Sequence, residues 1–313
     1  MSSIGGERVP RGVVLLAAYN GAKFIAPLVD SIDKSLDVAV SDDGSTDDTV
    51  GVLVSLDRAG LYLLPSIRSG SAGANFAYLV NQVPDTYDRY FFADQDDVWT
   101  SAKLERNLNE LASLEDQYGS STPCLVFSDA QVVDHNLSLL NSSFLKAEGL
   151  DYRFKDAFKL LCCQNVGQGA TFAFNRALLD VLRPMPSDVI MHDWWAMLAA
   201  SAFGKISFIN EPLILYRQHE HNVLGSKSES LVAQFNRFVF HRSELKRALQ
   251  RTQVNASMFL DVYHSDLPSG LIEFLTDYST LSEKVFLQRK WFSLRHGLKK
   301  TTLARTLGFY TFI

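Results

Sequence analysis

The sequence predicts an α/β fold: a doubly wound, mostly parallel sheet with flanking helices, followed by a C-terminal helical region. Three observations support this prediction. Short apolar runs alternate with amphipathic segments over the first two thirds of the chain, and two of these runs end directly in clusters of carboxylates. From about Ser228 onward the pattern is helical and amphipathic, with one break at 268–270. We therefore predict an α/β domain at residues 1–225 and a helical region at residues 226–313.

In the first half of the chain, each predicted strand is a short apolar run that ends in polar or glycine-containing turn residues. These runs are at 13–18, 38–40, 61–64 and 90–93. Amphipathic segments separate them at 24–34, from about 47 to 56, and after the loop 69–75. Because strands that alternate with helices pair in parallel, we expect their carboxyl ends to meet at one edge of the sheet.

The second half continues the alternation less regularly. We predict strands at 125–127, 170–174, 206–209 and 213–216, with helices at 154–163 and from His192 to about Gly204. A polar stretch up to about Gly149 separates the first of these strands from the first helix.

The composition is typical of a globular protein with a hydrophobic core, since 47% of the 313 residues are apolar and 12% are aromatic. The net charge of −5 gives no indication that the protein as a whole binds nucleic acid. The charge is uneven: residues 289–313 carry six basic side chains and no acid, so the rest of the chain is at −11 (−5 minus 6).

Three carboxylates follow the apolar run that ends at Ala93, namely Asp94, Asp96 and Asp97. Such a cluster repels itself, and each carboxylate is costly to desolvate unless a cation lies beside it. A divalent ion such as Mg²⁺ or Mn²⁺, which takes one or two carboxylates together with substrate phosphates, is the interpretation that we favour for Asp94 and Asp96. The alternative is a solvated acidic turn before the next helix, and Asp97 fits that alternative.

The second acidic cluster, residues 41–49, follows the strand at 38–40. Its adjacent Asp42 and Asp43 do not match the alternating carboxylates of an EF-hand, and the Gly-Lys-Ser/Thr ending of a phosphate-binding loop is absent. Carboxylates at a strand end suit neutral donors such as a pyrimidine N3–H and ribose hydroxyls. We interpret Asp47 or Asp48 as an N-cap.

Cys124, Cys162 and Cys163 are too few for a disulfide framework, so we expect buried thiols and a cytoplasmic, reducing compartment. The polar start of the sequence does not read as a signal peptide, and no run of about 18 apolar residues predicts a membrane span.

Six motifs, in this order and at these separations, resemble the family 2 glycosyltransferases with the GT-A fold, and in particular bacterial rhamnosyltransferase-like members. They are LLAAYNGAKFI, VAVSDDGSTDDT, FFADQDDVW, GATFAFNRAL, HDWW and YRQHEHNVLG. The resemblance covers about residues 12–225.

The resemblance implies roles for individual residues. The nucleotide sugar would be bound by residues at the strand ends, namely Ala17, Tyr19, Asp42, Asp43, Asn75, Asp94 and Gln95. The metal would be held by Asp96, Asp94 and His219. Asp193 would be the catalytic base; His192 precedes it where many members have glutamate, so the role of that neighbour stays open. The acceptor and sugar pocket would include Trp194, Trp195 and Arg217, although adjacent tryptophans on a helix are also common in cores.

The function implied by the resemblance is transfer of a sugar, with inversion, from a nucleotide diphosphate sugar to a hydroxyl. The family likeness suggests dTDP-rhamnose as donor and a glycan or lipid-linked glycan as acceptor, in bacterial surface polysaccharide synthesis. Two alternatives use similar acids. A sugar nucleotidylyltransferase would need a basic, glycine-rich loop after the first strand, which residues 19–23 match only thinly. A calcium-dependent sugar-binding module would have no use for a carboxylate such as Asp193 opposite the metal.

The basic tail at 289–313 also carries aromatic and leucine side chains, among them Trp291 and Leu294. A basic segment with aromatic anchors suits the surface of an anionic membrane, where a lipid-linked acceptor would be found. The alternative is a set of helices packed on the first domain.

Overall fold

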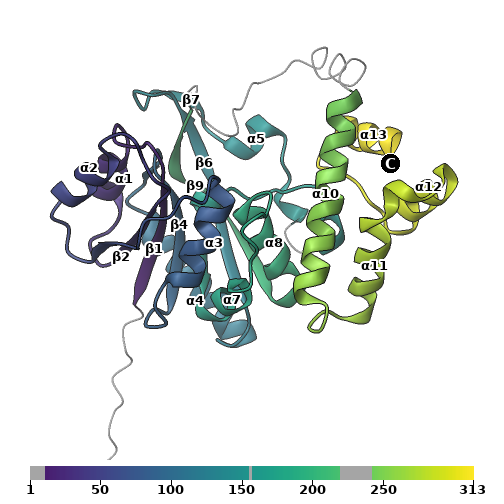
Figure 1. Ribbon diagram of the computed structural model, residues 1–313, viewed down its shortest axis with the longest axis horizontal. Helices are drawn as coiled ribbons and strands as arrows, with labels where there is room; N and C mark the ends of the chain where they lie inside the picture. Colours follow the sequence, from purple (N-terminus) through teal and green to yellow (C-terminus); the bar gives the residue numbers. More distant parts are fainter. Residues whose placement is uncertain (1–10, 155–156, 219–241) are drawn as a thin grey trace, which may run out of the picture.

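The computed structural model describes residues 11–154, 157–218 and 242–313 (Figure 1). The strands are β1 (Gly12–Ala18), β2 (Asp37–Asp42), β3 (Leu61–Leu63), β4 (Arg89–Asp94), β5 (Val98–Trp99), β6 (Cys124–Val133), β7 (Leu139–Asn141), β8 (Ala173–Asn175) and β9 (Lys205–Arg217). The helices up to β9 are α1 (Ile25–Ser31), α2 (Thr49–Ser55), α3 (Ala72–Gln82), α4 (Lys103–Tyr118), α5 (Phe144–Glu148), α6 (Phe158–Leu161), α7 (Arg176–Leu182) and α8 (His192–Phe203). The C-terminal helices are α10 (Arg242–Tyr263), α11 (Ser269–Ser279), α12 (Phe286–Arg295) and α13 (Leu303–Phe312).

The sheet has the order β3-β2-β1-β4-β8-β6-β9-β5, with β7 paired to β6. The four strands β3, β2, β1 and β4 are parallel to one another, and β6 is parallel to β9 along most of its length. The predicted α/β fold with a mostly parallel sheet is therefore confirmed. The short strand β8 runs antiparallel between β4 and β6, a feature that the sequence analysis did not identify.

Three predicted elements differ in the structure. The strand expected at 170–174 starts only at Ala173, because Gly169–Thr171 form a 3-10 turn in which the amide of Phe172 donates to the carbonyl of Gly169. The two strands expected at 206–209 and 213–216 are one strand, β9, since shifts of register around Asp129 let it pass Pro212 without interruption. The predicted helix 154–163 is reduced to α6, and the polar stretch before it contains β7 and α5.

Alternate residues of β1 face two cores on opposite sides of the sheet, as the twofold period of a strand requires. Val14 and Leu16 pack with α1 and α4 on one side. Val13 and Leu15 lie on the other side, in a core that includes residues of α3 and α8 and extends into the C-terminal helices.

The C-terminal helical region predicted from the sequence is present, and α10 lies against α8 (Figure 1). The ring of Trp195 on α8 packs on Phe259 of α10, with ring centroids 5.1 Å apart. Tyr263 of α10 accepts a hydrogen bond from the indole N–H of Trp195 at 3.2 Å and donates one to the carbonyl of Val181 at 2.7 Å. The domain boundary predicted near residue 225 lies outside the described residues. Within the described part of the chain, no helix is long and apolar enough to cross a membrane.

Candidate active site

The parallel register brings the two acidic clusters to the same edge of the sheet. Ala17 of β1 lies opposite Asp94 of β4, and Ala18 lies opposite Asp42 of β2. The carboxyl ends of three adjacent strands therefore stop at one level, where ligands bind in open α/β sheets.

A third carboxylate, Asp193 of α8, joins the acids that follow β4. Burial, together with the neighbouring charges of Asp96 and Asp193, raises the pKa of Asp94 to about 7. Because carboxylates affect one another's protonation at short range, these three residues form one acidic cluster. Asp94 and Asp193 are separated by 99 positions in the chain, so the fold brings them together (193 minus 94).

Asp193 lies in the first turn of α8 and is only 5% exposed. Its carboxylate accepts hydrogen bonds from the amides of Trp194, at 2.6 Å, and Gly169, at 3.2 Å. Burial raises its pKa to about 6, against the opposing effect of these bonds and of one to Asn165. The N-cap of α8 is Met191, so a plain N-cap role for Asp193 is excluded. A carboxylate with this pKa is ionised at neutral pH and can still accept a proton.

His192 precedes Asp193 at the start of α8 and is also buried. Its ring stacks on Phe76 with centroids 3.6 Å apart and is 3% exposed. Burial lowers its pKa to about 3, so the imidazole is neutral. A Cβ atom on Gly169 would come within 2.5 Å of its Nε2 atom, which explains the glycine at 169. The family resemblance did not predict a role for His192. In the structure, its ring packs against Gly169, whose amide donates a hydrogen bond to Asp193.

Asp97 is buried instead of lying in a solvated turn, which corrects one of the expectations above. Its Oδ1 atom accepts a hydrogen bond from the amide of Arg217 at 3.2 Å. Burial, followed by the charges of Asp96 and Asp94, raises its pKa well above the usual value. Lys103, fully buried with its Nζ atom 4.7 Å from the centre of the Trp99 ring, is the cation that acts on Asp97. The sequence analysis missed Lys103, because a lysine in the first turn of a helix normally lies in solvent.

Arg217 holds the loop that carries the acids. Its guanidinium donates to the carbonyls of Asp96, at 2.8 Å, and His135, at 2.6 Å, and it lies over the ring of Phe24. The side chain is 4% exposed. These contacts order the loop, and the acceptor-pocket role predicted for Arg217 stays a prediction.

The two tryptophans differ in burial. Trp195 is completely buried against the C-terminal helices, so it cannot stack on a sugar ring. Trp194 is partly buried, and its indole N–H donates to the carbonyl of Leu161 at 2.6 Å. Trp195 is thus a core residue, and a sugar contact for Trp194 stays a prediction.

Gln95 and Tyr19 are joined through a pair of backbone bonds. The Gln95 side chain accepts from the amide of Tyr19 at 2.9 Å and donates to its carbonyl at 2.8 Å. The aromatic ring of Tyr19 is 54% exposed beside these bonds. Gln95 therefore positions the turn after β1, and Tyr19 is an exposed part of this turn.

Asp42 and Asp43 both accept several hydrogen bonds from other residues of the protein. Asp42 accepts from the amides of Gly44 and Ser45 and from the Ser45 hydroxyl, so it orders its own turn. Asp43 accepts from the amides of Ser69 and Gly70, which tie the loop before α3 to the end of β2. The predicted contacts of both residues with the base and ribose stay predictions.

Asn75, in the first turn of α3, is 2% exposed and donates to the carbonyl of Ser41 at 3.1 Å. Its Oδ1 atom is buried and has no hydrogen-bond partner among the described residues. His219, the third metal ligand predicted, lies outside the described residues. Within the described ranges, no group of three or more His, Cys, Asp or Glu side chains is arranged to hold a metal ion.

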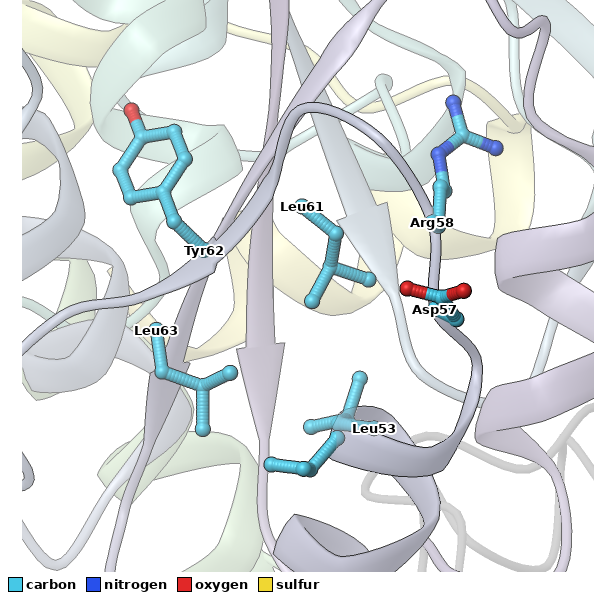
Figure 2. Close-up of a pocket in the computed structure, with 7 residues that line it drawn as sticks. Leu53, Asp57, Arg58, Leu61, Tyr62 and Leu63 are labelled. Carbon is cyan, nitrogen blue, oxygen red and sulfur yellow. The ribbon is translucent and has the colours of Figure 1, made fainter.

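The hollow shown in Figure 2 lies beside the edge strand β3 and is lined by residues such as Leu53, Arg58 and Tyr62. The guanidinium of Arg58 donates there to backbone carbonyls of Val29 and Ile32, both at 2.8 Å. No predicted site residue lines this hollow, so we attribute it to the joint between α1, α2 and the sheet.

No family model matches the chain. Two curated relatives align with it. The dTDP-rhamnosyl transferase RfbG of Shigella flexneri is 27% identical, over 82% of this chain and 89% of its own length. An uncharacterised glycosyltransferase of Nostoc sp. is 24% identical, over 67% of this chain and 65% of its own length.

Among solved structures, residues 1–349 of S. aureus TarS superpose with a TM-score of 0.50 at 15% identity, covering 91% of this chain and 78% of that one. A mannosyltransferase from Pyrobaculum calidifontis, in complex with GDP-Man and Mn²⁺, superposes with a TM-score of 0.53 at 15% identity, covering 93% of this chain and 74% of that one. These structures carry the same fold. The chain is a glycosyltransferase with the GT-A fold.

Neither alternative to a glycosyltransferase is favoured by these relatives, and Asp193 within the acidic cluster agrees with them. A nucleotidylyltransferase would need a basic loop after β1. In this glycosyltransferase the loop after β1 is instead bonded to residues 45–49: Asn20 donates its amide to the Ser45 hydroxyl at 2.9 Å, and Gly21 donates to the Thr49 hydroxyl at 2.8 Å.

Gly21→Ala should destabilise the glycosyltransferase, by about 1–3 kcal/mol, because a Cβ atom at this position would lie 2.1 Å from Oε1 of Gln95. Gln95 would have to release the backbone of Tyr19. Urea unfolding measures the effect. Gly270→Ala is the matched control, since a Cβ atom there meets nothing within 4 Å. Equal unfolding midpoints for the two variants would contradict this reading of Gln95.

Proposed function

We propose that the glycosyltransferase moves a sugar from a nucleotide diphosphate sugar to a hydroxyl group, with inversion at the anomeric carbon. The observation that supports this proposal most strongly is the acidic cluster, in which Asp193 of α8 lies close enough to Asp94 to raise its pKa. A metal-side pair of carboxylates and a separate buried carboxylate are the groups that such a transfer needs. The dTDP-rhamnose donor named for the Shigella relative is our first choice of substrate.

The nucleotide would lie over the ends of β1 and β2. The exposed ring of Tyr19 offers a surface on which a base can stack, and the unpartnered Oδ1 atom of Asn75 offers a buried acceptor. Ala17, opposite Asp94 in the register, has too small a side chain to block this approach. Asp42 and Asp43 would then use their remaining lone pairs on the base and ribose.

Asp94 and Asp96 fit the requirements of a Mg²⁺ or Mn²⁺ ion. Burial, and after it the charges of Asp96 and Asp193, raise the pKa of Asp94, and a divalent cation would favour its ionised form. Two carboxylates with a diphosphate make a sufficient ligand set for such an ion. When bound, the ion would neutralise charge on the leaving diphosphate. The mannosyltransferase of the same fold was solved with Mn²⁺.

Asp193 would act on the acceptor. As the acceptor oxygen forms its bond to the anomeric carbon, the Asp193 carboxylate takes the hydroxyl proton. The bond from that carbon to the diphosphate oxygen breaks, and the diphosphate leaves with the electron pair. Asn165 and the amide of Gly169 keep the carboxylate in place during this step.

The acceptor in this proposal is a glycan or a lipid-linked glycan of a bacterial surface polysaccharide. A lipid-linked acceptor is embedded in the membrane, whereas nucleotide sugars are made in the cytoplasm. The proposed enzyme is therefore cytoplasmic and works peripherally at the inner face of the cell membrane.

A panel of nucleotide sugars with and without Mn²⁺ tests the donor. A donor at about 100 times its Kd should raise the stability by about 2.7 kcal/mol, seen as a higher unfolding temperature. Release of free nucleotide diphosphate upon addition of acceptor would then support transfer. Release of pyrophosphate would point to a nucleotidylyltransferase, and binding without any product would point to a sugar-binding module.

Asp96→Ala should abolish the part of donor binding that depends on Mn²⁺, because one of two carboxylate ligands is lost. Calorimetric titration of nucleotide diphosphate, with and without Mn²⁺, measures this. Asp116→Ala, which removes an exposed carboxylate from α4, is the control and should bind as the wild type does. Equal affinity of Asp96→Ala and wild type in the presence of Mn²⁺ would remove Asp96 from the metal site.

A further inference from the structure

Large apolar side chains are unusually exposed on the C-terminal helices. Of the sixteen such side chains among the described residues, seven lie between positions 285 and 307. They are Val285, Phe286, Leu287, Trp291, Leu294, Leu303 and Leu307. Single exposed apolar side chains are ordinary, but a concentration of this kind marks an interaction surface.

Helix α12 is apolar on two sides. On its inner side, Phe292 is buried and stacks on Phe274 of α11, with centroids 5.6 Å apart. On its outer side, Leu287, Trp291 and Leu294 follow the spacing of one helical face and are 76%, 60% and 70% exposed. The inner side accounts for the packing of α12, whereas nothing in the described part of the chain covers the outer side.

The helix is held firmly enough to present this outer side in a fixed direction. The hydroxyl of Tyr310 on α13 donates to the carbonyl of Ser293 at 3.1 Å, and Lys290 donates to the carbonyl of Tyr310. Leu298 and Phe309 are buried next to these bonds. The inner side of α12 is therefore packed on α11 and α13, and this packing leaves the outer side unexplained.

Cations lie on the same surface as the exposed rings. The guanidinium of Arg295 lies 5.0 Å from the centre of the Trp291 ring, and Nζ of Lys290 lies 4.8 Å from that of Phe286. Residues 284–313 contain seven Lys and Arg side chains and no Asp or Glu. We call the group Phe286, Leu287, Lys290, Trp291, Leu294 and Arg295 the α12 face.

We infer that the α12 face binds the surface of an anionic lipid bilayer. Aromatic and leucine side chains of a surface helix enter the boundary between headgroups and acyl chains, while lysine and arginine pair with anionic headgroups. A second copy of this chain is a poorer partner, because a symmetric dimer would bring two basic faces together. Figure 1 places α12 at the opposite end of the molecule from α1 and α2, so a membrane there leaves the loops after β1 and β2 uncovered.

The test uses the full chain, without donor or acceptor, and two kinds of vesicle. One kind is phosphatidylcholine alone, and the other is an equal mixture of phosphatidylcholine and phosphatidylglycerol. We expect co-sedimentation with the mixed vesicles only, weakened by added salt. The double variant Trp291→Ser/Leu294→Ser should bind these vesicles about tenfold more weakly. Val54→Ser, which removes a side chain that is 68% exposed on α2, is the matched control and should bind as the wild type does.

Arg295→Glu separates the electrostatic part of the binding and should also weaken it severalfold. Equal binding of wild type to both kinds of vesicle, no binding to either, or wild-type binding by the double variant would each overturn the inference. A concentration-dependent dimer that is lost in the double variant would overturn it as well, by assigning the α12 face to a second copy.

The inference rests on the proposed function only for its biological setting, and the two fail separately. Vesicle binding needs no turnover, and release of nucleotide diphosphate to a water-soluble acceptor needs no vesicle. The double variant should retain this soluble activity. Loss of the soluble activity in the double variant would show that α12 serves the active site, which would contradict the assignment of its outer face to lipid.

Discussion

Asp193→Asn should lower the rate of sugar transfer by about 10²–10⁴-fold while leaving the affinity for donor unchanged. Asparagine keeps one acceptor oxygen, which can accept from the amide of Trp194 or from that of Gly169 but not from both, because the two amides donate to different oxygens of Asp193. A role limited to these backbone hydrogen bonds predicts a lower unfolding midpoint with nearly normal turnover of the folded enzyme. The donor is bound by other residues in our proposal, which is why its affinity should not change. Steady-state transfer, measured beside a donor titration, separates the two roles.

The pH dependence of the wild-type rate provides an independent check. Since the pKa of Asp193 is raised to about 6, the carboxylate becomes protonated as the pH falls through 6, and transfer should decline about tenfold for each further unit. At saturating Mn²⁺, which would keep the proposed ligand Asp94 ionised although its pKa is raised to about 7, the residual activity of Asp193→Asn should lack this decline. A variant with normal turnover, or one that keeps the acid limb, would remove Asp193 as the base.

Lys103→Met should destabilise the protein by about 1–3 kcal/mol, because it removes the cation that acts on the buried Asp97. Burial lowers the pKa of Lys103 to about 7, which shows how strongly this position disfavours an isolated charge. Urea unfolding would register the change as a lower midpoint with an unchanged slope. Lys34→Met is the matched control: Lys34 forms an exposed ion pair with Asp30 at 4.0 Å, worth about 0–1 kcal/mol.

A second substitution tests whether the loss comes from the pair. Asp97→Asn keeps an oxygen for the amide of Arg217 but removes the charge. In the double variant Asp97→Asn/Lys103→Met, we expect a large part of the lost stability to return. Additive losses in the double variant would show that Lys103 acts through packing on Trp99 and not through Asp97.

The parallel half of the sheet could be predicted from the sequence alone. The same is true of the sheet edge at which the acids lie. Strands 13–18, 38–40 and 90–93 were recognisable because buried parallel strands are continuous apolar runs, a property of adjacent residues. Asp94 and Asp96 were recognisable for the same reason, since an acidic run directly after a buried strand is a local pattern. Motif order then related the chain to the glycosyltransferases.

The hydrogen-bond partners of the polar groups, and the burial of several side chains, could be seen only in the tertiary structure. Trp195 is buried by α10, more than 60 positions away, so no local pattern could reveal its burial. The side chains of Gln95 and Arg217 bond to distant backbone atoms, which no spacing of residue types specifies. The same holds for the direction of the short strand β8, set by its pairing with β4 and β6. A sequence pattern indicates which residues of one helix or strand face the core. Hydrogen-bond partners and charge interactions depend instead on distances between residues that come together only when the chain folds.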